Sequence, residues 1–511
     1  MYLAPSSMIS EIDKYCATAM GIPVLTLMER AGSAVADVVT GHTPTGGRVV
    51  ILAGKGNNGG DGYAAACLLM KEFEVSVYDV FGEGQKSEEG RFFLSKFQSL
   101  GGRVENLKLD EQTKLYISSA DCIVDAIFGT GFHGEPPRII AELAELITAC
   151  RGRKIAIDVP MGVNADNGSV TDVSVVGMDV TVALSFIKPG LVSFPAKAYV
   201  GKIIYNDLGI PRESLVEHFD FKYKYLESRL ARAMLPKRAE NSSKGSFGRL
   251  LVITGSKRYR GAAHLSLNAA LRGGAGYVTY LGDDELCREL LPTYPEAIYK
   301  SMSAVDSITD EDIDLAIELS RSSSATLIGC GSDSSRGLFR LVSALLCSEG
   351  SPIILDADAI NALTQNREEA LGLIRRSSRR VILTPHPLEF ARLSGNDVSF
   401  VQLHRIEAAM KFAAENKCIL VLKGAGTIVT DGSDVYINSS GSSALSKAGS
   451  GDVLAGFLAS VVASGADPIT GAALSVYYHG AAADSLSRQY SVIGVTPSDL
   501  PLEIAKQVAS V

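Results

Sequence analysis

The sequence predicts an α/β protein built from two three-layer α/β/α domains. Three observations support this prediction: short β-branched runs recur along the 511 residues, helical patterns lie between them, and one charged stretch interrupts the alternation. Strands that alternate with helices form a parallel sheet with helices on both faces. The charged stretch divides the chain into predicted domains at residues 1–215 and 241–511, with a connection at residues 216–240.

The predicted strands of the first domain are short apolar runs, each ended by the turn-forming residues Gly, Asp or Pro. Helical patterns separate them, for example at Tyr63–Lys71 and Ile139–Cys150. The strands are Arg48–Ala53, Glu74–Val80, Asp121–Asp125, Lys154–Asp158 and Asp179–Leu184.

The second domain repeats the pattern without repeating the sequence. Ligands of parallel sheets bind at the carboxyl ends of the strands, so the residues directly after each strand are the candidates for function. The predicted strands are Arg249–Thr254, Tyr277–Tyr280, Ala325–Ile328, Pro352–Leu355, Arg380–Leu383 and Cys418–Leu422.

Composition excludes several classes of function. The chain has 49 Lys and Arg against 57 Asp and Glu, a net charge of −8, which argues against a nucleic-acid or anionic-membrane binder. No uncharged run approaches the roughly 18 residues of a spanning helix, and no secretory signal is evident. Eight single Cys without a CxxC pair indicate reduced thiols, and seven His lack zinc-ligand spacing. A cytoplasmic enzyme is the expectation.

The most distinctive local feature is the glycine-rich loop at residues 53–62, between a predicted strand and a helix. Gly54, Gly56 and Gly59 satisfy the GxGxxG pattern, and Asp79 follows twenty residues after the last of them, so an NAD-dependent dehydrogenase is one alternative. Asp61 argues against it, because a carboxylate would repel a pyrophosphate at the helix N-terminus. A simple turn that caps the helix is the other alternative.

Polar groups at neighbouring strand ends predict an oxygen-rich pocket beside this loop. Asp125 and Asp158 each end a strand, and Asn58 lies in the loop. Carboxylate and amide oxygens suit hard cations, so Asn58 and Asp125 are candidate ligands of a monovalent or other hard cation.

Residues 8–205 resemble the epimerase domain of the NAD(P)H-hydrate repair enzymes, through the motifs GNNGGDG, DAIFGTGFHGE, AIDVPMGV and SFIKPG. The resemblance implies a Rossmann-like domain that binds a hydrated nicotinamide nucleotide and potassium (K⁺). The implied substrate contacts are Asn57, Asn58, Gly59, Gly60, Asp61, Gly129, Thr130, Gly131, Phe132, His133, Gly134, Glu135 and Asp158.

The implied potassium ligands are Asn58, Asp125 and the residue at position 161. This family usually has Ser there, whereas this chain has Met161, and a thioether is a poor ligand for a hard cation. Either a backbone carbonyl of Met161 supplies the contact, or potassium binding and epimerase activity are weakened. Asp158 is the expected acid–base residue, with Lys188 as the other candidate.

In the second domain, Gly449, Ser450 and Gly451 precede an apolar helical run, so several N–H groups point at one place. This arrangement suits a transferring phosphoryl group, and Asp452 in the first turn can accept a proton from a substrate hydroxyl. A helix cap with a favourably placed carboxylate is the structural alternative. His386 and Glu389, at i and i+3, follow another strand.

Residues 245–505 resemble the ribokinase-like fold, and within it the ADP-dependent NAD(P)H-hydrate dehydratases, through LDADAINAL, ILTPHPLEFARLSG, LKGAGTIV and GSGDVLAG. The resemblance implies that His386-x-x-Glu389 replaces an Asn-x-x-Glu pair that organises phosphate and magnesium (Mg²⁺). Implied contacts to the hydrated nucleotide are Ala263, Gly331, His386 and Asp452. Implied contacts to the adenine nucleotide are Lys423, Gly424, Ala425, Gly426, Thr427 and Gly451.

Together the two resemblances imply metabolite repair. The first domain would interconvert the R and S epimers of NADHX and NADPHX, and the second would dehydrate the S epimer with ADP, giving AMP and phosphate. The partners are then small molecules, without nucleic acid or membrane, and a homo-oligomer is left open. The alternative is a vitamin- or sugar-type small-molecule kinase with a non-catalytic nucleotide-binding N-terminal module, which Met161 keeps open.

Overall fold

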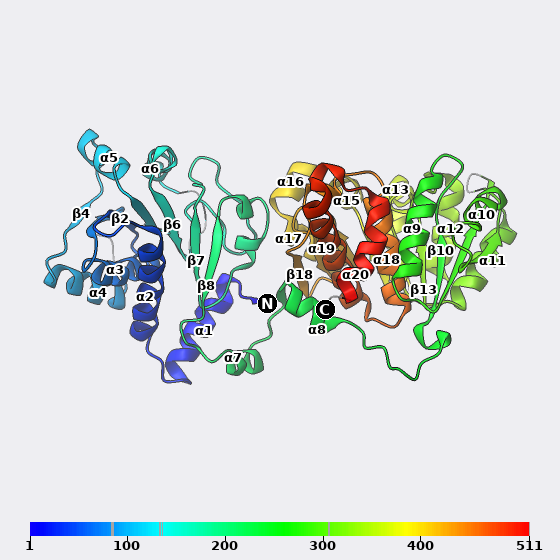
Figure 1. Ribbon diagram of the computed structural model, residues 1–511, viewed down its shortest axis with the longest axis horizontal. Helices are drawn as coiled ribbons and strands as arrows, with labels where there is room; N and C mark the ends of the chain where they lie inside the picture. The colour runs from blue at the N-terminus through cyan, green and yellow to red at the C-terminus, as the bar shows by residue number, and fades with distance from the viewer. Residues whose placement is uncertain (83–85, 132–133, 135, 305–306, 510–511) are drawn as a thin grey trace. The chain divides into compact units, whose positions relative to one another are not determined.

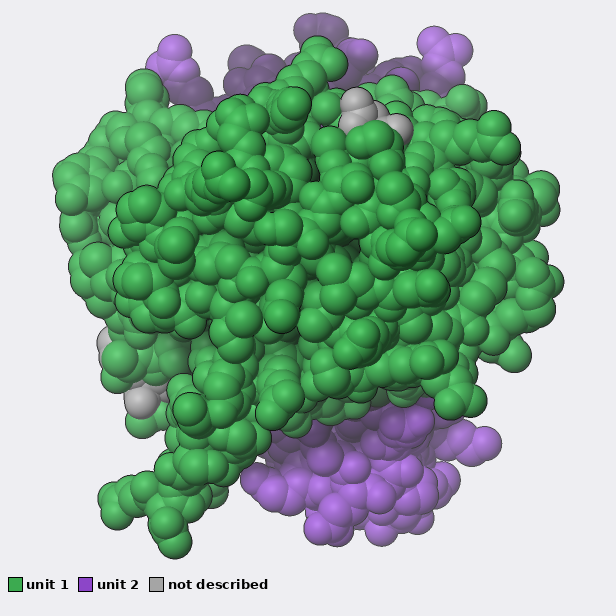
Figure 2. Space-filling model, turned by 90° about the vertical axis from the view of Figure 1, so that its right-hand side faces the viewer, with its two compact units in different colours: residues 1, 224–511 green, residues 2–223 purple. Residues whose placement is uncertain are grey.

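The computed structural model describes residues 1–82, 86–131, 134, 136–304 and 307–509 (Figure 1). The chain divides into two compact units, one of residues 2–223 and one from Lys224 onward together with Met1 (Figure 2). The division falls inside the segment expected as a connection. That segment is folded: β9 (Tyr223–Leu226) lies next to β18 in the sheet of the C-terminal unit, and Ala231 of α8 is buried in a core cluster of that unit.

The N-terminal unit contains a parallel sheet with the strand order β4-β3-β2-β5-β6-β7-β8. The short strand β1 (Tyr2–Leu3) is not part of this sheet. The strands of the sheet are β2 (Arg48–Ala53), β3 (Glu74–Asp79), β4 (Val104–Asn106), β5 (Cys122–Ala126), β6 (Arg153–Ile157), β7 (Val180–Leu184) and β8 (Lys202–Asn206). Its helices are α1 (Ser6–Thr18), α2 (Val24–His42), α3 (Asn57–Leu69), α4 (Glu88–Ser99), α5 (Glu111–Ser118), α6 (Arg138–Ala149) and α7 (Arg212–His218).

The predicted strands of this unit are confirmed to within one residue at each end, and the edge strands β4 and β8 were not predicted. The chain passes from β2 to β3 toward one edge of the sheet, and from β5 to β6 toward the other edge. Because such crossovers are right-handed, α3 and α6 lie on opposite faces of the sheet. The alternate side chains of β2 agree with this, since Val49 belongs to the cluster that contains α3 and Val50 to the cluster that contains α6.

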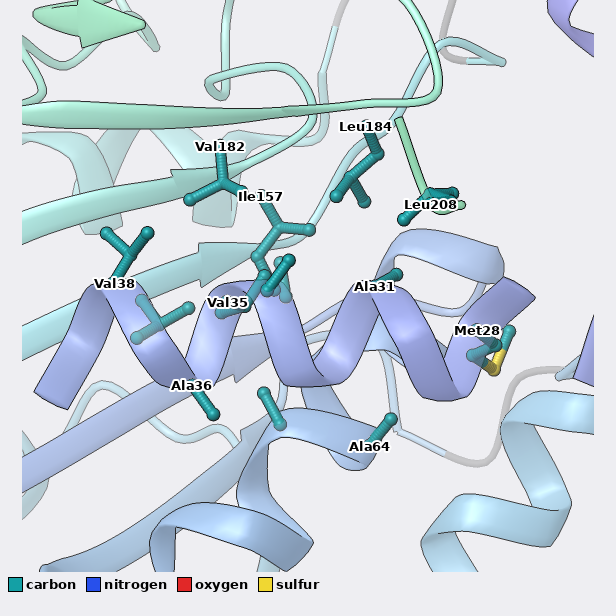
Figure 3. Close-up of a cluster of buried hydrophobic side chains, with 14 of the residues drawn as sticks. Met28, Ala31, Val35, Ala36, Val38, Ala64, Ile157, Val182, Leu184 and Leu208 are labelled. Atoms are coloured by element: carbon teal, nitrogen blue, oxygen red, sulfur yellow. The ribbon is translucent and has the colours of Figure 1, made fainter. Parts of the chain in front are cut away.

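Helix α2 lies along one face of this sheet (Figure 3). Its Val35 side chain lies beside Ile157 of β6 and Val182 of β7, and all three are fully buried. A Cβ atom on Gly32 would lie 2.5 Å from the Cβ of Ala64 on α3. This position therefore requires glycine, because the two helices approach too closely for a larger side chain.

The C-terminal unit contains a second sheet, in which the strands follow the order β9-β18-β17-β16-β15-β14-β13-β10-β11-β12. Its further strands are β10 (Arg249–Ile253), β11 (Tyr277–Gly282), β12 (Ile298–Ser301), β13 (Ala325–Ile328), β14 (Ile353–Leu355), β15 (Val381–Leu383), β16 (Ile419–Leu422), β17 (Ile428–Thr430) and β18 (Val435–Asn438). Its helices are α8 (Ser228–Met234), α9 (Arg260–Arg272), α10 (Asp284–Leu290), α11 (Asp310–Arg321), α12 (Arg336–Cys347), α13 (Asp358–Gln365), α14 (Arg367–Arg376), α15 (Pro387–Ser394), α16 (Val398–Leu403), α17 (Arg405–Asn416), α18 (Ser450–Ala463), α19 (Pro468–Gly494) and α20 (Leu500–Ala509).

Strands β10 to β16 pair in parallel, whereas β17 and β18 extend the sheet as an antiparallel hairpin. The predicted strands of this half are confirmed, and β12, β17 and β18 were not predicted. Helices α9, α18 and α19 pack with strand residues in one core cluster. Leu251 and Ile353, whose side chains are not in that cluster, are also fully buried, so both faces of the sheet are covered. Among the described residues, no helix is long and apolar enough to cross a membrane.

A matched pair of leucines tests the packing of the N-terminal unit. Leu143 on α6 is fully buried, whereas Leu115 on the neighbouring α5 is 73% exposed. We expect Leu143→Ala to lower the free energy of unfolding by about 2–5 kcal/mol, because it leaves a cavity. Leu115→Ala should change it by no more than about 0.5 kcal/mol. Urea unfolding followed by circular dichroism measures both, and equal losses would contradict the described packing.

Candidate active sites

The N-terminal unit has a cavity of about 540 Å³ at the carboxyl edge of its sheet. It opens where the strand order reverses between β2 and β5, the usual ligand position in parallel sheets. Helices α1 and α2 and the segments after β2, β5, β6 and β7 form its wall. The predicted site residues that line it are Asn57, Asn58, Asp61, Gly129, Thr130, Gly131, Asp158 and Lys188.

At two positions of the glycine-rich loop, the backbone lies very close to another backbone segment. A Cβ on Gly54 would lie 1.9 Å from the carbonyl oxygen of Ile127, and one on Gly59 would lie 2.1 Å from the carbonyl oxygen of Gly54. Only glycine fits either place, so the start of α3 rests directly on the backbone around β2 and β5. Gly59 and Gly60 are buried and do not line the cavity.

Part of the predicted GTGFHGE loop lies within the described residues. Gly129, Thr130 and Gly131 line the cavity, and Gly134 is exposed. The expected contacts Phe132, His133 and Glu135 lie outside the described residues.

Asp158 and Lys188 form a buried ion pair on the cavity wall. The Lys188 side chain is 1% exposed, and its ammonium also donates to the carbonyl oxygen of Leu184 at 2.9 Å. Asp158 has a φ of 62°, and Ser185, after the adjacent strand, has a φ of 61°. Two neighbouring left-handed residues are strained, and such strain is often kept where it aims functional groups.

Asp61 and Asp13 add two carboxyl groups to the same cavity. Burial raises the pKa of Asp61 well above its usual range, and the charges of Asp158 and Asp13 raise it further. This shift favours the protonated form of Asp61, which weakens the repulsion expected of a carboxylate at this helix N-terminus. Burial also raises the pKa of Asp13, to about 6, against the opposing charge of Lys188.

The expected potassium ligands converge beneath the cavity. The Asn58 amide nitrogen donates to the carbonyl oxygen of Phe128 at 2.5 Å, while its Oδ1 is buried without a hydrogen-bond partner in the described part of the chain. The Asp125 carboxylate is buried and accepts the N–H groups of Met161 at 2.7 Å and Ile127 at 3.1 Å. Burial nevertheless raises its pKa to about 6, so a cation would suit it.

Met161 does not use its sulfur here. Its side chain is fully buried in the apolar cluster beneath the sheet, with Ile127 and Met178 among its members. A potassium contact from the Met161 backbone stays a prediction.

The dehydrogenase alternative required Asp79 as a ribose ligand. Instead, the Asp79 carboxylate is buried and forms an ion pair with Lys86 at 2.5 Å. Asp79 is thus paired with a lysine, although its spacing from the glycine-rich loop matches the dinucleotide-binding pattern.

The C-terminal unit has its own group of charged residues where the strand order reverses between β10 and β13. Asp356, directly after β14, is buried and accepts hydrogen bonds from Lys423 Nζ at 2.7 Å and Thr384 Oγ1 at 2.6 Å. The Cys330 thiol lies 3.4 Å from the other oxygen of Asp356. Burial raises the pKa of Cys330 well above its usual range, so it remains a thiol.

Asp452 lies in the first turn of α18, after the left-handed Gly449 with a φ of 99°. Its carboxylate belongs with Cys330 and Asp356 to a group whose ligand atoms lie within 4.8 Å of one another. Burial and the Asp356 charge raise the pKa of Asp452 to about 7. The group can therefore exchange a proton near neutral pH, as a general base must.

His386 and Glu389 both cap helix α15. The His386 Nδ1 accepts the N–H groups of Leu388 and Glu389 at 3.2 Å, and Glu389 Oε2 accepts the N–H of His386 at 2.8 Å. Nδ1 is thus unprotonated, and burial and Lys423 lower the pKa of the ring. Burial raises the pKa of Glu389 to about 7.

Most of the residues expected in this site converge. A Cβ on Gly451 would lie 3.4 Å from Lys423 Nζ, which places the start of α18 over the lysine. A Cβ on Gly331 would lie 2.5 Å from the Cβ of Ala262, next to the buried Ala263. Gly424, Ala425, Gly426 and Thr427 form the turn after β16, closed by a 2.9 Å hydrogen bond from the Thr427 hydroxyl to the carbonyl of Gly424.

Several of these partners were not predicted from the sequence. Asp356 was not among the predicted site residues, and its contacts to Thr384 and Lys423 join three different strand ends. Asp13 was missed altogether. The sequence did contain a sign of its role, because Asp13 is a charged residue on the helix face that carries the apolar Ile9 and Cys16.

Two family models match the chain. The one described as NAD(P)H-hydrate dehydratase matches residues 250–506, and the one described as YjeF-related protein N-terminus matches residues 24–190. The bifunctional NAD(P)H-hydrate repair enzyme of Moorella thermoacetica is 33% identical, over 98% of this chain and 95% of the relative. The chain belongs to the family of bifunctional NAD(P)H-hydrate repair enzymes.

Other comparisons agree with this assignment. The bifunctional repair enzyme of Escherichia coli is 30% identical, over 96% of this chain and 90% of the relative. A ribokinase-like superfamily protein from Enterococcus faecalis matches 57% of this chain and 97% of its own, with a TM-score of 0.50 and 23% identity, which supports the ribokinase-like fold. The two predicted resemblances are confirmed, and each half of the chain carries one of the two domains of a repair enzyme. Neither the dehydrogenase nor the kinase alternative fits this membership.

Replacing Lys423 tests the charge balance of the dehydratase-type unit. Lys423→Met would leave the buried Asp356 without its cation, and breaking a buried pair costs about 3–5 kcal/mol. We expect a clear fall in the melting temperature of that unit. Lys411→Met is the control, because Lys411 and its partner Glu415 are 77% and 60% exposed, so this change should alter stability little. Equal melting temperatures for the two variants would show that Asp356 does not depend on Lys423.

Proposed function

We propose that this chain repairs hydrated NADH and NADPH in two steps, each in one unit. The N-terminal unit interconverts the R and S epimers of NAD(P)HX, and the C-terminal unit dehydrates the S epimer with ADP. The observation that carries the proposal is the pair of sites at the two sheet edges. One holds an ion-paired Asp158 beside a cavity, and the other holds Asp452 at a helix N-terminus. We expect the protein to carry out this repair in the cytoplasm, where NADH and NADPH are used.

The dehydration step follows from the chemistry of a poor leaving group. Asp452 accepts the proton of the C6 hydroxyl, whose oxygen attacks the terminal phosphorus of ADP and releases AMP. Donors at the start of α18 and the Lys423 ammonium stabilise the transferring phosphoryl group. The ring nitrogen then expels phosphate from C6, and loss of the C5 proton restores the dihydronicotinamide.

Magnesium would be held mainly by the nucleotide phosphates, with protein carboxylates completing the site, as is usual for this ion. Glu389 is the carboxylate suited to this role, since Asp452 is the proposed base and Asp356 is already bonded to Lys423 and Thr384. Bound magnesium supplies charge neutralisation for the phosphates. The adenine nucleotide is proposed to contact the 423–427 turn and Gly451.

The epimerase step needs a group that helps water leave from C6 and return. Asp158 is the proposed acid–base residue, acting together with its partner Lys188 on the cavity wall. The Asn58 and Asp125 side chains and the Met161 carbonyl are the proposed potassium ligands. The buried, unpartnered Asn58 oxygen within the described residues fits such an ion. Potassium would supply positive charge that fixes the glycine loop.

Recovery of NADH from an equal mixture of R- and S-NADHX tests the whole proposal. The full chain with magnesium, potassium and ADP should convert all the hydrate to NADH, faster than spontaneous epimerisation permits. Recovery that stops near half would overturn the epimerase assignment alone. No recovery with ADP or ATP would overturn the repair function and favour a small-molecule kinase.

The pH dependence of dehydration tests Asp452. A base acts in its ionised form, so the rate should rise with pH through about 7 and fall below it, in accordance with the raised pKa. Asp452→Asn should lower kcat by about 10²–10⁴-fold and remove this dependence. Steady-state rates on S-NADHX across pH measure both effects. An Asp452→Asn variant with an unchanged profile would exclude Asp452 as the base.

The potassium requirement tests the role of Asn58. Epimerisation of R-NADHX should require potassium in the wild type, and Asn58→Ala should raise the potassium concentration needed for half-maximal rate. Met161→Leu should leave that concentration unchanged, because its sulfur lies in the apolar cluster. Potassium titrations of the three proteins provide the measurement. A strong effect of Met161→Leu would instead make the thioether a ligand.

A further inference from the structure

A carboxyl group with no assigned role lies in the epimerase-type cavity. Asp13 lines that cavity from helix α1, together with Asp61, Asp158 and Lys188. The helix packs through Ile9, Ile12 and Cys16, and Asp13 lies on the same face, four residues after the first and three before the last. A carboxylate on a packed helix face destabilises the fold unless it has partners.

The nearby cation that could pair with the Asp13 carboxylate is bonded to other groups. Within the described part of the chain, no hydrogen bond or ion pair joins its carboxylate to another side chain. The nearby cation, Lys188, is bonded to Asp158 and to the carbonyl oxygen of Leu184. Asp13 interacts with Lys188 and Asp158 through their charges only, and burial raises its pKa to about 6. A carboxylate that lines a binding cavity without a partner among the described side chains points to a functional role.

Resting on the proposed epimerase function, we propose that Asp13 is a second proton-transfer residue, which accepts a proton from the water that re-adds to C6. Epimerisation at C6 removes water from one face of the ring and adds it to the other. One group must give a proton to the departing hydroxyl, and another must take a proton from the incoming water. The Lys188–Asp158 pair and Asp13 come from different elements and line the same cavity, so they suit these two tasks.

The proposed step balances as follows. The Lys188–Asp158 pair gives its shared proton to the C6 hydroxyl, the C6–O bond breaks, and the ring-nitrogen lone pair forms a C=N bond as water leaves. A second water attacks C6 from the opposite face, its oxygen forms the new C6–O bond, and its proton passes to Asp13. The C=N electron pair returns to nitrogen. Transfer of one proton from Asp13 back to the pair through solvent restores the enzyme.

Other charged groups face Asp13 from the neighbouring elements. Asp61 lies on α3, Asp158 and Lys188 follow β6 and β7, and Lys55 lies in the loop after β2. Burial and the charges of Asp158 and Asp13 raise the pKa of Asp61 well above its usual range, which favours its protonated form. Asp13 is therefore the carboxyl group of this cavity whose ionisation should shape the rate near pH 6.

The test measures NADH formation from R-NADHX by the full chain, with ADP present so that its own dehydratase consumes the S epimer. In the wild type the epimerase-limited rate should rise with pH through about 6 as Asp13 becomes a base. Asp13→Asn should lower kcat at least about 100-fold with KM nearly unchanged, and should remove this pH dependence. Asp13→Glu should keep part of the rate and the dependence.

Two controls separate this role from a structural one. Glu11→Gln is the matched change on the exposed face of the same helix, and should leave the rate unchanged. Asp13→Asn should also melt at or above the wild-type temperature, because a raised carboxyl pKa means that the ionised form destabilises the folded state. Dehydration of S-NADHX should be unaffected in all variants.

Each other outcome overturns the inference. An Asp13→Asn variant with wild-type kcat and pH profile would exclude proton transfer by Asp13, and one with only a raised KM would make it a binding residue. A lowered melting temperature, with Asp13→Glu lacking the pH dependence, would make its role structural. A wild type without epimerase activity overturns the proposed function itself, and this inference with it.

Discussion

Both candidate sites depend on a lysine–aspartate ion pair, with at least one partner buried, at the end of a parallel strand. In the N-terminal unit the pair is Lys188 with Asp158, and in the C-terminal unit it is Lys423 with Asp356. A lone charge in either place would carry a large desolvation cost, which the attraction between the two partners offsets. One lysine cannot neutralise every carboxyl group nearby. The remaining carboxyl groups therefore have raised pKa values, which is the property that proton transfer near neutral pH requires.

The position of these pairs follows from topology. In each sheet the strand order reverses once, between β2 and β5 or between β10 and β13. At that point the connecting helices leave toward opposite faces, and the strand ends are left open to a ligand. Glycine at the start of α3 and α18 lets the helix N-terminus come close to this edge. The two units thus present similar architecture but different chemistry, one around a cavity and the other around an anion-binding helix start.

Several elements were predictable from local pattern, and others were not. The core strands are apolar and β-branched on both faces, so their pattern identifies them without tertiary information. The edge strand β4 has the sequence Val-Glu-Asn and is largely exposed, so it lacks this signal. The β17–β18 hairpin had a usable signal in Asp431-Gly432 between two β-branched runs. Met161 shows the limit of motif reasoning, since its backbone, not its sulfur, faces Asp125.

The sequence by itself determined the two α/β/α folds, the family and most of the residues at the strand ends, because periodicity and motifs are local properties. The tertiary structure alone decided which of these residues share a site and which charges are neutralised. Asp356 meets Lys423 across 67 positions of sequence, and Asp158 meets Lys188 across 30. Asp13 joins the cavity from a helix that carries no motif. Burial and pairing arise only when distant segments pack, and they set the protonation of each carboxyl group.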